Sequence, residues 1–488
     1  MLVLFEDENW RHFAPLIYTR PIYDIRCGAF ALHERIRALL ATRPDALAHT
    51  NGQALHLPLP LSQFAPILKK AGTDDGISGD GAVLPNAMAG LCRPYMQACY
   101  GPTEGLSALL RNSTPITLLN GRALSLEWLP DLLRATVNTV YVADGVLLGA
   151  KISPALASAV LYYLQTQRAA DALEELQRFA RVVEVEALLL AYPWDLINQA
   201  GEQLVRDLPL LAARLPRYTS HDPQIVVRGD DVYVSPTAKL DGPLVLDARD
   251  GPIYLDDECH IEPFSFIQGP AYVGKQTLVA SARIRAETSL GPVCRVGGEI
   301  EASTFQGFSN KHHDGFLGHS WLGEWVNIGA MTTNSDLKNT YGNIKVVIEQ
   351  LGSFNSGTLK LGCFLADHVK LGIGMHLTGG TMIGPGSSLF AVHMVPKTVP
   401  AFTWGSDVFY EYRINDMIDV ARKVMKRRKQ VMSPAYEAML REVFLMTRHY
   451  RDGMHADVPG AVREAGEQAL TAAGVPASEH GPGVALSA

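Results

Sequence analysis

Three histidines and several side-chain amides gather in one segment of low charge, Ser309 to Thr340. Histidine titrates close to neutral pH, and amides donate and accept hydrogen bonds. Such groups could provide the general base, the orienting contacts and the oxyanion donors of an acyltransferase. We predict that His319 is the general base. Asn327, Asn334 and backbone N–H groups near Ala330 would orient the nucleophile or polarise the carbonyl group of a thioester.

The same histidines allow two other interpretations, and both stay open. His312, His313 and His319 could form a zinc-type site, because imidazole and carboxylate groups are common zinc ligands. The nearby acids are Asp314 and Glu324. The histidines could instead only satisfy backbone groups in a loop, the more common role for a pair such as His312 and His313. We therefore assign a catalytic role to His319 alone and leave the metal unassigned.

Charged residues near the N-terminus could serve a different reaction, nucleotidyl transfer. That reaction needs a backbone that cradles phosphates, positive charge beside the leaving pyrophosphate, and acids that hold Mg²⁺. Arg20 and Arg26 could provide the positive charge, since arginine binds phosphate with a planar fork. Four acids are candidates for holding the metal: Glu6, Asp7, Asp24 and Asp144. An equally open alternative is that Arg20, Arg26 and Arg122 pair with carboxylates and only hold the domain together.

The composition limits the class of protein and its partners. The chain has 488 residues, of which 47% are apolar, so it should form two or three domains. The formal net charge of -7 offers no basic surface for nucleic acid. No apolar run is long enough to span a membrane, and the six cysteines form no CxxC pair. We expect a cytoplasmic protein without nucleic-acid or membrane partners.

The first 200 residues alternate between apolar runs and amphipathic segments. The runs MLVLFED, ITLLNG and TVYVADGVLLGAKI predict buried strands. GAFALHERIRALLATR and LEWLPDLLRAT carry apolar residues at spacings of three and four, which predicts helices. We therefore predict a Rossmann-like α/β domain over residues 1–200, followed by a linker over residues 201–224.

From about residue 225, aliphatic residues recur every six positions. With one slip of a residue, the positions are Leu255, Ile261, Ile267, Val273, Leu278, Ile284, Leu290, Val296, Leu365, Leu371, Leu377, Ile383 and Leu389. Small residues often follow four places later. A short strand plus a tight corner takes about six residues, and three such sides close a triangular coil. We predict a parallel β-helix over residues 225–404; the alternative is a β-sandwich, although its strands would alternate with a period of two.

Two segments depart from the six-residue spacing, 305–320 and 334–357, and we expect both to be loops outside the coil. Residues 405–452 are expected to form helices with apolar stripes. We interpret the basic run over residues 423–429 as a solvated face, with an anion site as the alternative. The Ala-, Gly- and Pro-rich residues 453–488 are expected to be a disordered tail.

Motifs within the β-helix resemble those of a known family. ARIR, GHSWLGE, VNIGAMTTNSD and a later Lys occur in the same order in bifunctional enzymes that acetylate glucosamine 1-phosphate and then transfer a uridylyl group to the product. The resemblance implies that Arg285 and Lys311 hold the sugar phosphate and that His319 is the general base. A loop before Lys311 and Ser335 in place of an aromatic residue depart from the family pattern.

The same resemblance implies contacts for the sugar and for the acyl donor. Asn327, Asn334 and Asp336 would contact the sugar. Three residues would line a slot for acyl-coenzyme A: Ala330, Leu371 and Gly379.

Longer motifs resemble a group of sugar nucleotidyltransferases related to those enzymes. They are TRPIYDIRCGAFALHERI, LLNGR, SNKHHDGFLGHSWLGEWVNIGA, TNSDLKNTYG and VPAFTWG. The resemblance implies a degenerate nucleotidyltransferase-like N-terminal domain, a left-handed β-helix and a homotrimer. Two features depart from active relatives: no glycine-rich loop follows the first strand, and Arg122 stands where an acid would grip the metal.

These observations together predict a transferase of nucleotide-sugar metabolism. We expect acetyl-coenzyme A to be the acyl donor for an amino-sugar phosphate, coupled to nucleotidyl transfer from a nucleoside triphosphate with Mg²⁺. The product would be a nucleoside diphosphate sugar. The alternatives are a binding or assembly protein that has lost one or both activities, or a metal-dependent lyase like the hexapeptide-repeat carbonic anhydrases.

Overall fold

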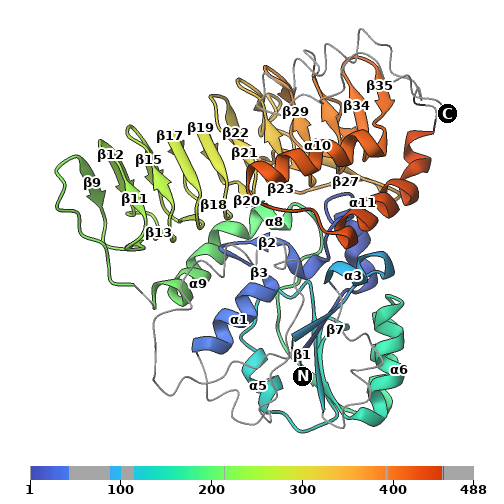
Figure 1. Ribbon diagram of the computed structural model, residues 1–488. Helices are drawn as coiled ribbons and strands as arrows, with labels where there is room; N and C mark the ends of the chain where they lie inside the picture. Colours follow the sequence, from blue (N-terminus) through green and yellow to red (C-terminus); the bar gives the residue numbers. More distant parts are fainter. Residues whose placement is uncertain are drawn as a thin grey trace. The chain divides into compact units, whose positions relative to one another are not determined.

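The computed structural model describes residues 2–42, 88–100, 115–213, 215–390, 394–452 and 454 (Figure 1). The chain divides into two compact units. The first comprises Met1–Arg214 and Ser433–Glu442, and the second comprises Leu215–Met432 and Val443–Ala488. The tail expected beyond residue 452 lies outside the described residues, apart from Met454.

The first unit contains a six-stranded sheet in the order β4-β1-β5-β7-β6-β8. Its strands are β1 (Leu2–Phe5), β4 (Met88–Leu91), β5 (Ile116–Asn120), β6 (Thr139–Ala143), β7 (Val146–Ile152) and β8 (Arg181–Glu184). β1 runs parallel to β4 and β5, whereas β7 runs antiparallel to β5 and β6. The sheet is therefore mixed, because the tight turn after β6 returns the chain antiparallel to it.

The first unit also contains helices, and two of its helices share an apolar core with the sheet. The helices are α1 (Leu32–Thr42), α3 (Gln97–Tyr100), α5 (Leu129–Arg134), α6 (Pro154–Gln165), α7 (Ala169–Phe179), α8 (Asp195–Asn198) and α9 (Ala200–Ala212). Val160 and Leu164 of α6 and Leu176 of α7 share one buried cluster with Val3 and Phe5 of β1. The α/β class predicted for the N-terminal part is confirmed.

The second unit is a parallel β-helix whose strands stack in three columns. The first face contains β10 (Val232–Val234), β13 (Ile253–Leu255), β16 (Ala271–Val273), β18 (Thr288–Leu290), β20 (Thr304–Gly307), β23 (Trp321–Glu324), β28 (Phe364–Leu365), β31 (Met382–Ile383) and β33 (Thr398–Val399). All neighbours in this column are parallel. The predicted β-helix is therefore confirmed (Figure 1).

The other two faces are built in the same way. The second face contains β11 (Lys239–Leu240), β14 (His260–Ile261), the first parts of β17 (Leu278–Ile284) and β19 (Arg295–Glu301), β21 (Asn310–Lys311), β24 (Asn327–Ile328), β29 (Lys370–Leu371), β32 (Ser388–Leu389) and β34 (Thr403–Gly405). The third face contains β9 (Ile225–Arg228), β12 (Leu244–Asp247), β15 (Phe266–Gln268), the second parts of β17 and β19, β22 (Phe316–Gly318), β25 (Thr333–Asn334) and β30 (His376–Leu377).

One aliphatic residue per strand points into the prism, and this explains the six-residue spacing. Twelve of the thirteen predicted positions belong to one buried cluster. The exception is Leu278, because Val279 takes the interior position and the slip falls within β17, where the pairing shifts between Ala280 and Arg283. Each buried aliphatic side chain contributes about 1.5–3 kcal/mol to stability.

The small residues at the corners connect successive coils through hydrogen bonds. Thr277 donates to the carbonyl of Gly291 at 2.7 Å and accepts from the Cys294 N–H at 3.0 Å. Ser309 repeats the pattern with Gly323 and Val326. Only a small hydroxyl side chain can occupy such a buried corner and satisfy the backbone at the same time.

The first predicted outer loop, 305–320, is instead a regular part of the coil. Its residues form β20, β21 and β22 in the three columns. The six-residue spacing was hidden there because Lys311, rather than an aliphatic residue, holds the interior position opposite Val296. The second predicted loop does leave the coil. It contains the antiparallel hairpin β26 (Lys345–Ile348) and β27 (Gly352–Asn355).

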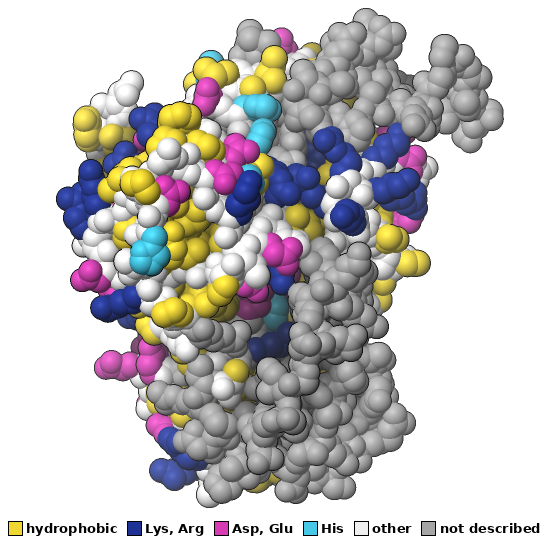
Figure 2. Space-filling view, turned by 60° about the vertical axis from the view of Figure 1, so that its left-hand side comes forward, with side chains coloured by type: hydrophobic (Ala, Val, Ile, Leu, Met, Phe, Trp, Pro, Cys, Tyr) yellow, Lys and Arg dark blue, Asp and Glu magenta, His cyan; other side chains and the backbone are white. Residues whose placement is uncertain are grey.

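The β-helix ends in the antiparallel pair β34 and β35 (Phe409–Glu411), followed by α10 (Ile414–Arg427) and α11 (Pro434–Met446). α10 buries Met417, Ile418, Ala421 and Met425 on one stripe. Apolar patches and charged side chains of both signs share the face shown in Figure 2. Among the described residues, no helix combines the length and the apolar character needed to cross a bilayer.

Candidate functional site

His319 occupies a corner of the prism, between β22 on the third face and β23 on the first. Its backbone is left-handed, with φ at 49°, like the corner residues Glu287 and Ala302 in earlier coils. The N–H of His319 donates to the carbonyl of Glu301 at 2.9 Å, and its own carbonyl accepts from the Gly362 N–H at 2.8 Å. Neighbouring coils on both sides therefore fix the backbone from which the imidazole projects.

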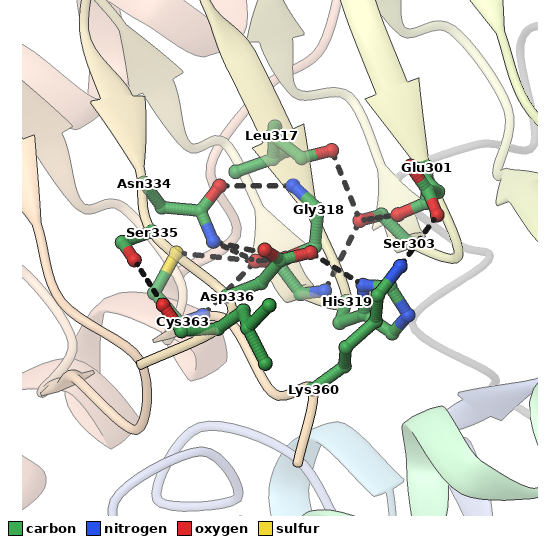
Figure 3. Close-up of polar contacts among 12 residues, drawn as sticks. Glu301, Ser303, Leu317, Gly318, His319, Asn334, Ser335, Asp336, Lys360 and Cys363 are labelled. Carbon is green, nitrogen blue, oxygen red and sulfur yellow. Dashed lines mark hydrogen bonds and ion pairs between the residues drawn. The ribbon is translucent and has the colours of Figure 1, made fainter. Parts of the chain in front are cut away.

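The imidazole forms a short hydrogen bond with a carboxylate. His319 Nδ1 lies 2.7 Å from Asp336 Oδ2, and the two side chains are only 15% and 14% exposed (Figure 3). A carboxylate accepts a proton from Nδ1, so the neutral ring carries its lone pair on Nε2. Among the described residues, Nε2 has no hydrogen-bond partner. The pair has the arrangement of a general base held by an orienting acid.

Asp336 stays ionised in this arrangement. Burial raises the pKa of Asp336, but the hydrogen bond and charge of His319, together with the charge of Lys360, outweigh it, and the net pKa lies below the usual value. Lys360 also forms an ion pair with Glu301 at 3.3 Å. The ionised carboxylate can therefore stabilise a positive charge that develops on the imidazole.

Asn334 holds the peptide that precedes His319. Its Oδ1 accepts from the Gly318 N–H at 2.8 Å, and its Nδ2 donates to the Gly318 carbonyl at 2.9 Å. The side chain is only 4% exposed. These contacts favour a positioning role, because both polar ends of the amide are used by the backbone. The predicted catalytic role of Asn334 stays a prediction.

Gly318 permits the close approach of Asp336. A Cβ atom at this position would lie 2.6 Å from Asp336 Oδ2, which is closer than such atoms pack. A larger residue at this position would therefore displace the carboxylate of Asp336 or the ring of Phe316.

Arg285 shares an edge of the prism with His319, two coils earlier. It directly follows β17 and aligns with Glu301, the last residue of β19, and its Nη1 lies 3.4 Å from Glu299. Arg283 binds the same carboxylate at 3.0 Å. The guanidinium of Arg285 is 44% exposed, so it can reach a ligand on this edge. Its predicted contact with a sugar phosphate is compatible with this placement.

The structure does not bring Lys311 or Asn327 to the same edge. Lys311 points into the prism, fully buried, and its Nζ donates to the carbonyl of His313. Burial lowers the pKa of Lys311 to about 8 despite the nearby charge of Asp314. This burial opposes the predicted contact of Lys311 with a sugar phosphate, which stays a prediction. Asn327 lies on the second face, where its Oδ1 accepts from Asn310 at 3.3 Å.

The three predicted cofactor residues do not form one slot within a single chain. Leu371 is fully buried in the interior column, so its side chain cannot line a surface slot. The carbonyl of Ala330 accepts from Gly374 at 2.8 Å. A Cβ at Gly379 would lie 2.9 Å from Ile344 Cδ1, which shows that the segment leading into the β26–β27 hairpin covers this position.

The proposed histidine metal site is not assembled. The rings of His312 and His313 meet edge-on, with centroids 5.0 Å apart, whereas His319 turns to Asp336. Within the ranges that the structure describes, no group of three or more His, Cys, Asp or Glu side chains is placed to hold a metal ion. The geometry gives the metal-dependent lyase no support.

In the first unit, the candidate acids are engaged by arginines. Arg122 Nε lies 2.8 and 2.9 Å from the two oxygens of Asp7, and Asn120 donates to the same carboxylate at 2.9 Å. Glu6 accepts from the Ile22 N–H at 2.9 Å and forms an ion pair with Arg93 at 3.3 Å. These acids do not fit the role of Mg²⁺ ligands, because cations and amide groups already occupy their oxygens.

Arg20 and Arg26 are also buried in ion pairs. Arg20 binds Asp24 at 2.8 Å, and Arg26 binds Glu34 at 3.1 Å and the carbonyl of Ala29. The exposed fractions of Arg20 and Arg26 are 1% and 4%. The contacts agree with the structural alternative considered for these arginines. Asp144, the fourth candidate acid, lies in the exposed turn between β6 and β7.

Sequence reasoning missed the partnership between His319 and Asp336. The two residues are 17 positions apart, the same separation as Asn310 and Asn327, which pair in adjacent coils. The length of one coil was therefore a usable signal. Residues 335–361 leave the coil and interrupt the regular spacing. This interruption concealed the pairing of His319 with Asp336 in the sequence.

The comparisons with known proteins agree with the resemblance drawn from the motifs. Residues 2–56 and 81–215 match a family model described as sugar nucleotidyl transferase. The bifunctional protein GlmU of Acidithiobacillus ferrooxidans (strain ATCC 53993 / BNL-5-31) is 27% identical over 184 residues, which cover 37% of this chain and 35% of that protein. GlmU of Acidovorax sp. (strain JS42) is 30% identical over 131 residues, or 25% of this chain and 26% of that protein.

Among solved structures, the polysialic acid O-acetyltransferase OatWY matches 37% of this chain and 84% of its own. The identity is 12% and the TM-score is 0.23, which is too low to carry an argument. The chain spans about a third of the length of the first GlmU relatives. The expected resemblance to sugar nucleotidyltransferases related to GlmU is confirmed.

Proposed function

From this relationship to sugar nucleotidyltransferases and GlmU, we propose that the chain is a sugar-phosphate transferase whose β-helix acetylates an amino sugar. The observation that supports the proposal most strongly is the hydrogen bond between His319 and Asp336 at a partly exposed corner. Acetyl-coenzyme A would be the acyl donor, and an amino-sugar phosphate would be the acceptor.

The proposed reaction follows from the position of the lone pair on His319 Nε2. The sugar amine attacks the thioester carbonyl, and His319 takes the proton that the nitrogen loses as the C–N bond forms. The tetrahedral intermediate then expels the coenzyme A sulfur, which receives the proton back from the imidazole. Asp336 holds the ring throughout and balances its transient charge. The products are an amide and a free thiol.

The acceptor phosphate would bind at the basic edge next to this pair. Arg285 and Lys360 are about half exposed, and each contacts a glutamate that a phosphate could replace as the partner. Asn327 and Ala330 lie at other positions around the prism. They would complete the site only from a second copy of the chain, which is consistent with the proposed homotrimer.

A direct assay tests this function. Full-length protein is supplied with acetyl-coenzyme A and a set of amino-sugar phosphates, and release of free thiol is followed. His319→Ala should lower the rate by about 10² to 10⁴. His313→Ala is the matched control, because His313 is exposed, lies in the same coil and does not contact the pair. Equal rates for wild type and His319→Ala would remove the imidazole from the mechanism.

Coupled nucleotidyl transfer is the second part of the proposal, supported by the family match over residues 2–56 and 81–215. The buried ion pairs of Asp7 and Glu6 oppose it, since the usual metal ligands are engaged. Pyrophosphate release from nucleoside triphosphates and sugar phosphates, with and without Mg²⁺, tests this part. A protein that releases thiol but no pyrophosphate is a single-activity enzyme.

A binding or assembly protein remains the alternative from a different class. It would retain the fold and show neither activity. Weak or absent stabilisation by nucleotides and acyl-coenzyme A compounds in a thermal-shift series would favour this alternative, because a bound ligand raises the melting temperature by an amount that grows with the ratio of its concentration to its Kd.

A further inference from the structure

A small cavity lies on the second face of the β-helix, away from the corner that carries His319. It has a volume of about 30 Å³ and lies between strands β21, β24 and β29 and the end of α10. Its lining residues are Phe308, Asn310, Trp325, Val326, Asn327, Lys370, Val424, Arg427 and Arg428. None of these described residues is acidic.

Two of the lining side chains place positive charge at the cavity. Lys370 is only 3% exposed, and its ammonium donates to the carbonyl of Trp325. Arg428 donates from Nη2 to Asn310 Oδ1 at 2.7 Å. Among the described residues, neither cation forms an ion pair within 4 Å with a carboxylate. In these contacts, Lys370 and Arg428 donate hydrogen bonds only to uncharged oxygen atoms.

Further cations surround Arg428 and raise the local potential. Burial and the charges of Arg295 and Arg427 lower the pKa of Arg428 to about 10. Burial lowers the pKa of Lys370 to about 7, although the charge of Asp367 opposes this effect. Burial is the largest cause in both groups, so these cations are largely removed from water, and the ammonium of Lys370 is fully charged only below about pH 7.

The walls select for a compact ligand. Phe308 and Trp325 stack with ring centroids 4.5 Å apart and are both buried. Hydrogen bonds fix the amides of Asn310 and Asn327 in a chain that begins at Arg428. The space accommodates about one water-sized particle. A volume of about 30 Å³ therefore favours a small ligand over a larger one.

We propose that this cavity binds a single small inorganic anion of about the size of chloride, held between Lys370 and Arg428. By binding both Arg428, just after α10, and Lys370 on the second face, the anion would hold the end of α10 against the β-helix. This site goes beyond the proposed transferase function and does not depend on it. It also gives the basic run over residues 423–429 a role other than a solvated face.

The experiment compares anions at constant ionic strength. The melting temperature of the full-length protein is measured while chloride is replaced by gluconate, which is too large for the cavity. Chloride should raise the melting temperature by at least about 2 °C. Arg428→Met and Lys370→Met should each abolish the chloride effect. Lys426→Met is the control, because Lys426 is exposed on α10 and does not line the cavity.

A measurement on the wild-type protein keeps the test independent of variant folding. Crystals soaked in bromide should show an anomalous peak between Lys370 and Arg428. Absence of this peak, or an equal chloride effect in wild type and Arg428→Met, overturns the proposal. Stabilisation by phosphate or sulfate without chloride also overturns it, because those ions are larger than the assigned ligand.

Discussion

At the scale of single residues, the central feature is the pairing of His319 with Asp336. The carboxylate is expected to act through the imidazole and not on the substrate. Asp336→Asn keeps the shape of the side chain and removes its charge, so kcat should fall at least about tenfold while the KM for acetyl-coenzyme A stays near that of wild type. A rise of KM with unchanged kcat would instead indicate that Asp336 binds substrate.

Arg122 provides a second prediction at the residue scale. It binds Asp7 inside the first unit, where both side chains are almost fully buried. Arg122→Ala leaves the carboxylate without its cation, which should lower the free energy of unfolding by about 3–5 kcal/mol. Urea denaturation measures the change. Arg134→Ala removes an exposed ion pair with Asp131 and should cost less than about 1 kcal/mol. Similar losses in both variants would contradict the assignment.

At the scale of elements, the coil holds polar residues inside the prism at Lys311 and Asn334. Each satisfies its polar atoms on backbone groups of a corner. Such residues weaken the aliphatic column and define the local shape of the corner that carries His319. The place where polar residues interrupt the aliphatic column is therefore also the place of the candidate site.

Lys311 yields a prediction of pH dependence for this element. Its pKa of about 8 in the folded chain lies below the usual 10.5 of lysine. Between these values the unfolded chain holds a proton that the folded chain has lost, so this lysine makes stability rise with pH by up to about 1.4 kcal/mol per unit. Below about pH 8 the full cost of burying the charge is present.

Lys311→Met should remove this dependence, because methionine fills similar space without a charge. The variant should be more stable than wild type at pH 7, and the difference should shrink towards pH 10. Chemical denaturation at the two pH values measures it, with the exposed Lys239→Met as the control. A difference that does not change with pH would show that the pKa of Lys311 is not lowered in the folded chain.

At the scale of the whole molecule, two units with different chemistry share one chain. The β-helix presents the proposed base His319, its partner Asp336 and exposed cations on one edge. In the first unit, Glu6, Asp7 and Arg20 lie in buried ion pairs, which agrees with a structural role for these candidates. We therefore expect the thiol-releasing activity to survive Arg122→Lys, provided the variant folds, since no residue of the proposed acyl transfer depends on that pair.

The order of elements and the coiled architecture could be predicted from the sequence. The aliphatic spacing identifies the prism because one interior residue per side is a geometric requirement of a three-sided coil. The residue type of His319 and the motif around it were enough to predict it as the base, and its role stays a prediction. Alternating apolar and amphipathic segments were enough to predict the α/β class of the first unit.

The partners of those residues were decided by the tertiary structure. Periodicity alone cannot show that Lys311 replaces an aliphatic residue inside the coil, because a lysine in a sequence is normally predicted to lie on the surface. The sequence also leaves Arg122 and Asp7 far apart along the chain, whereas the sheet brings their side chains into contact. Neighbours across coils and strands depend on which distant segments stack, and stacking depends on the summed packing of the whole unit rather than on any local pattern.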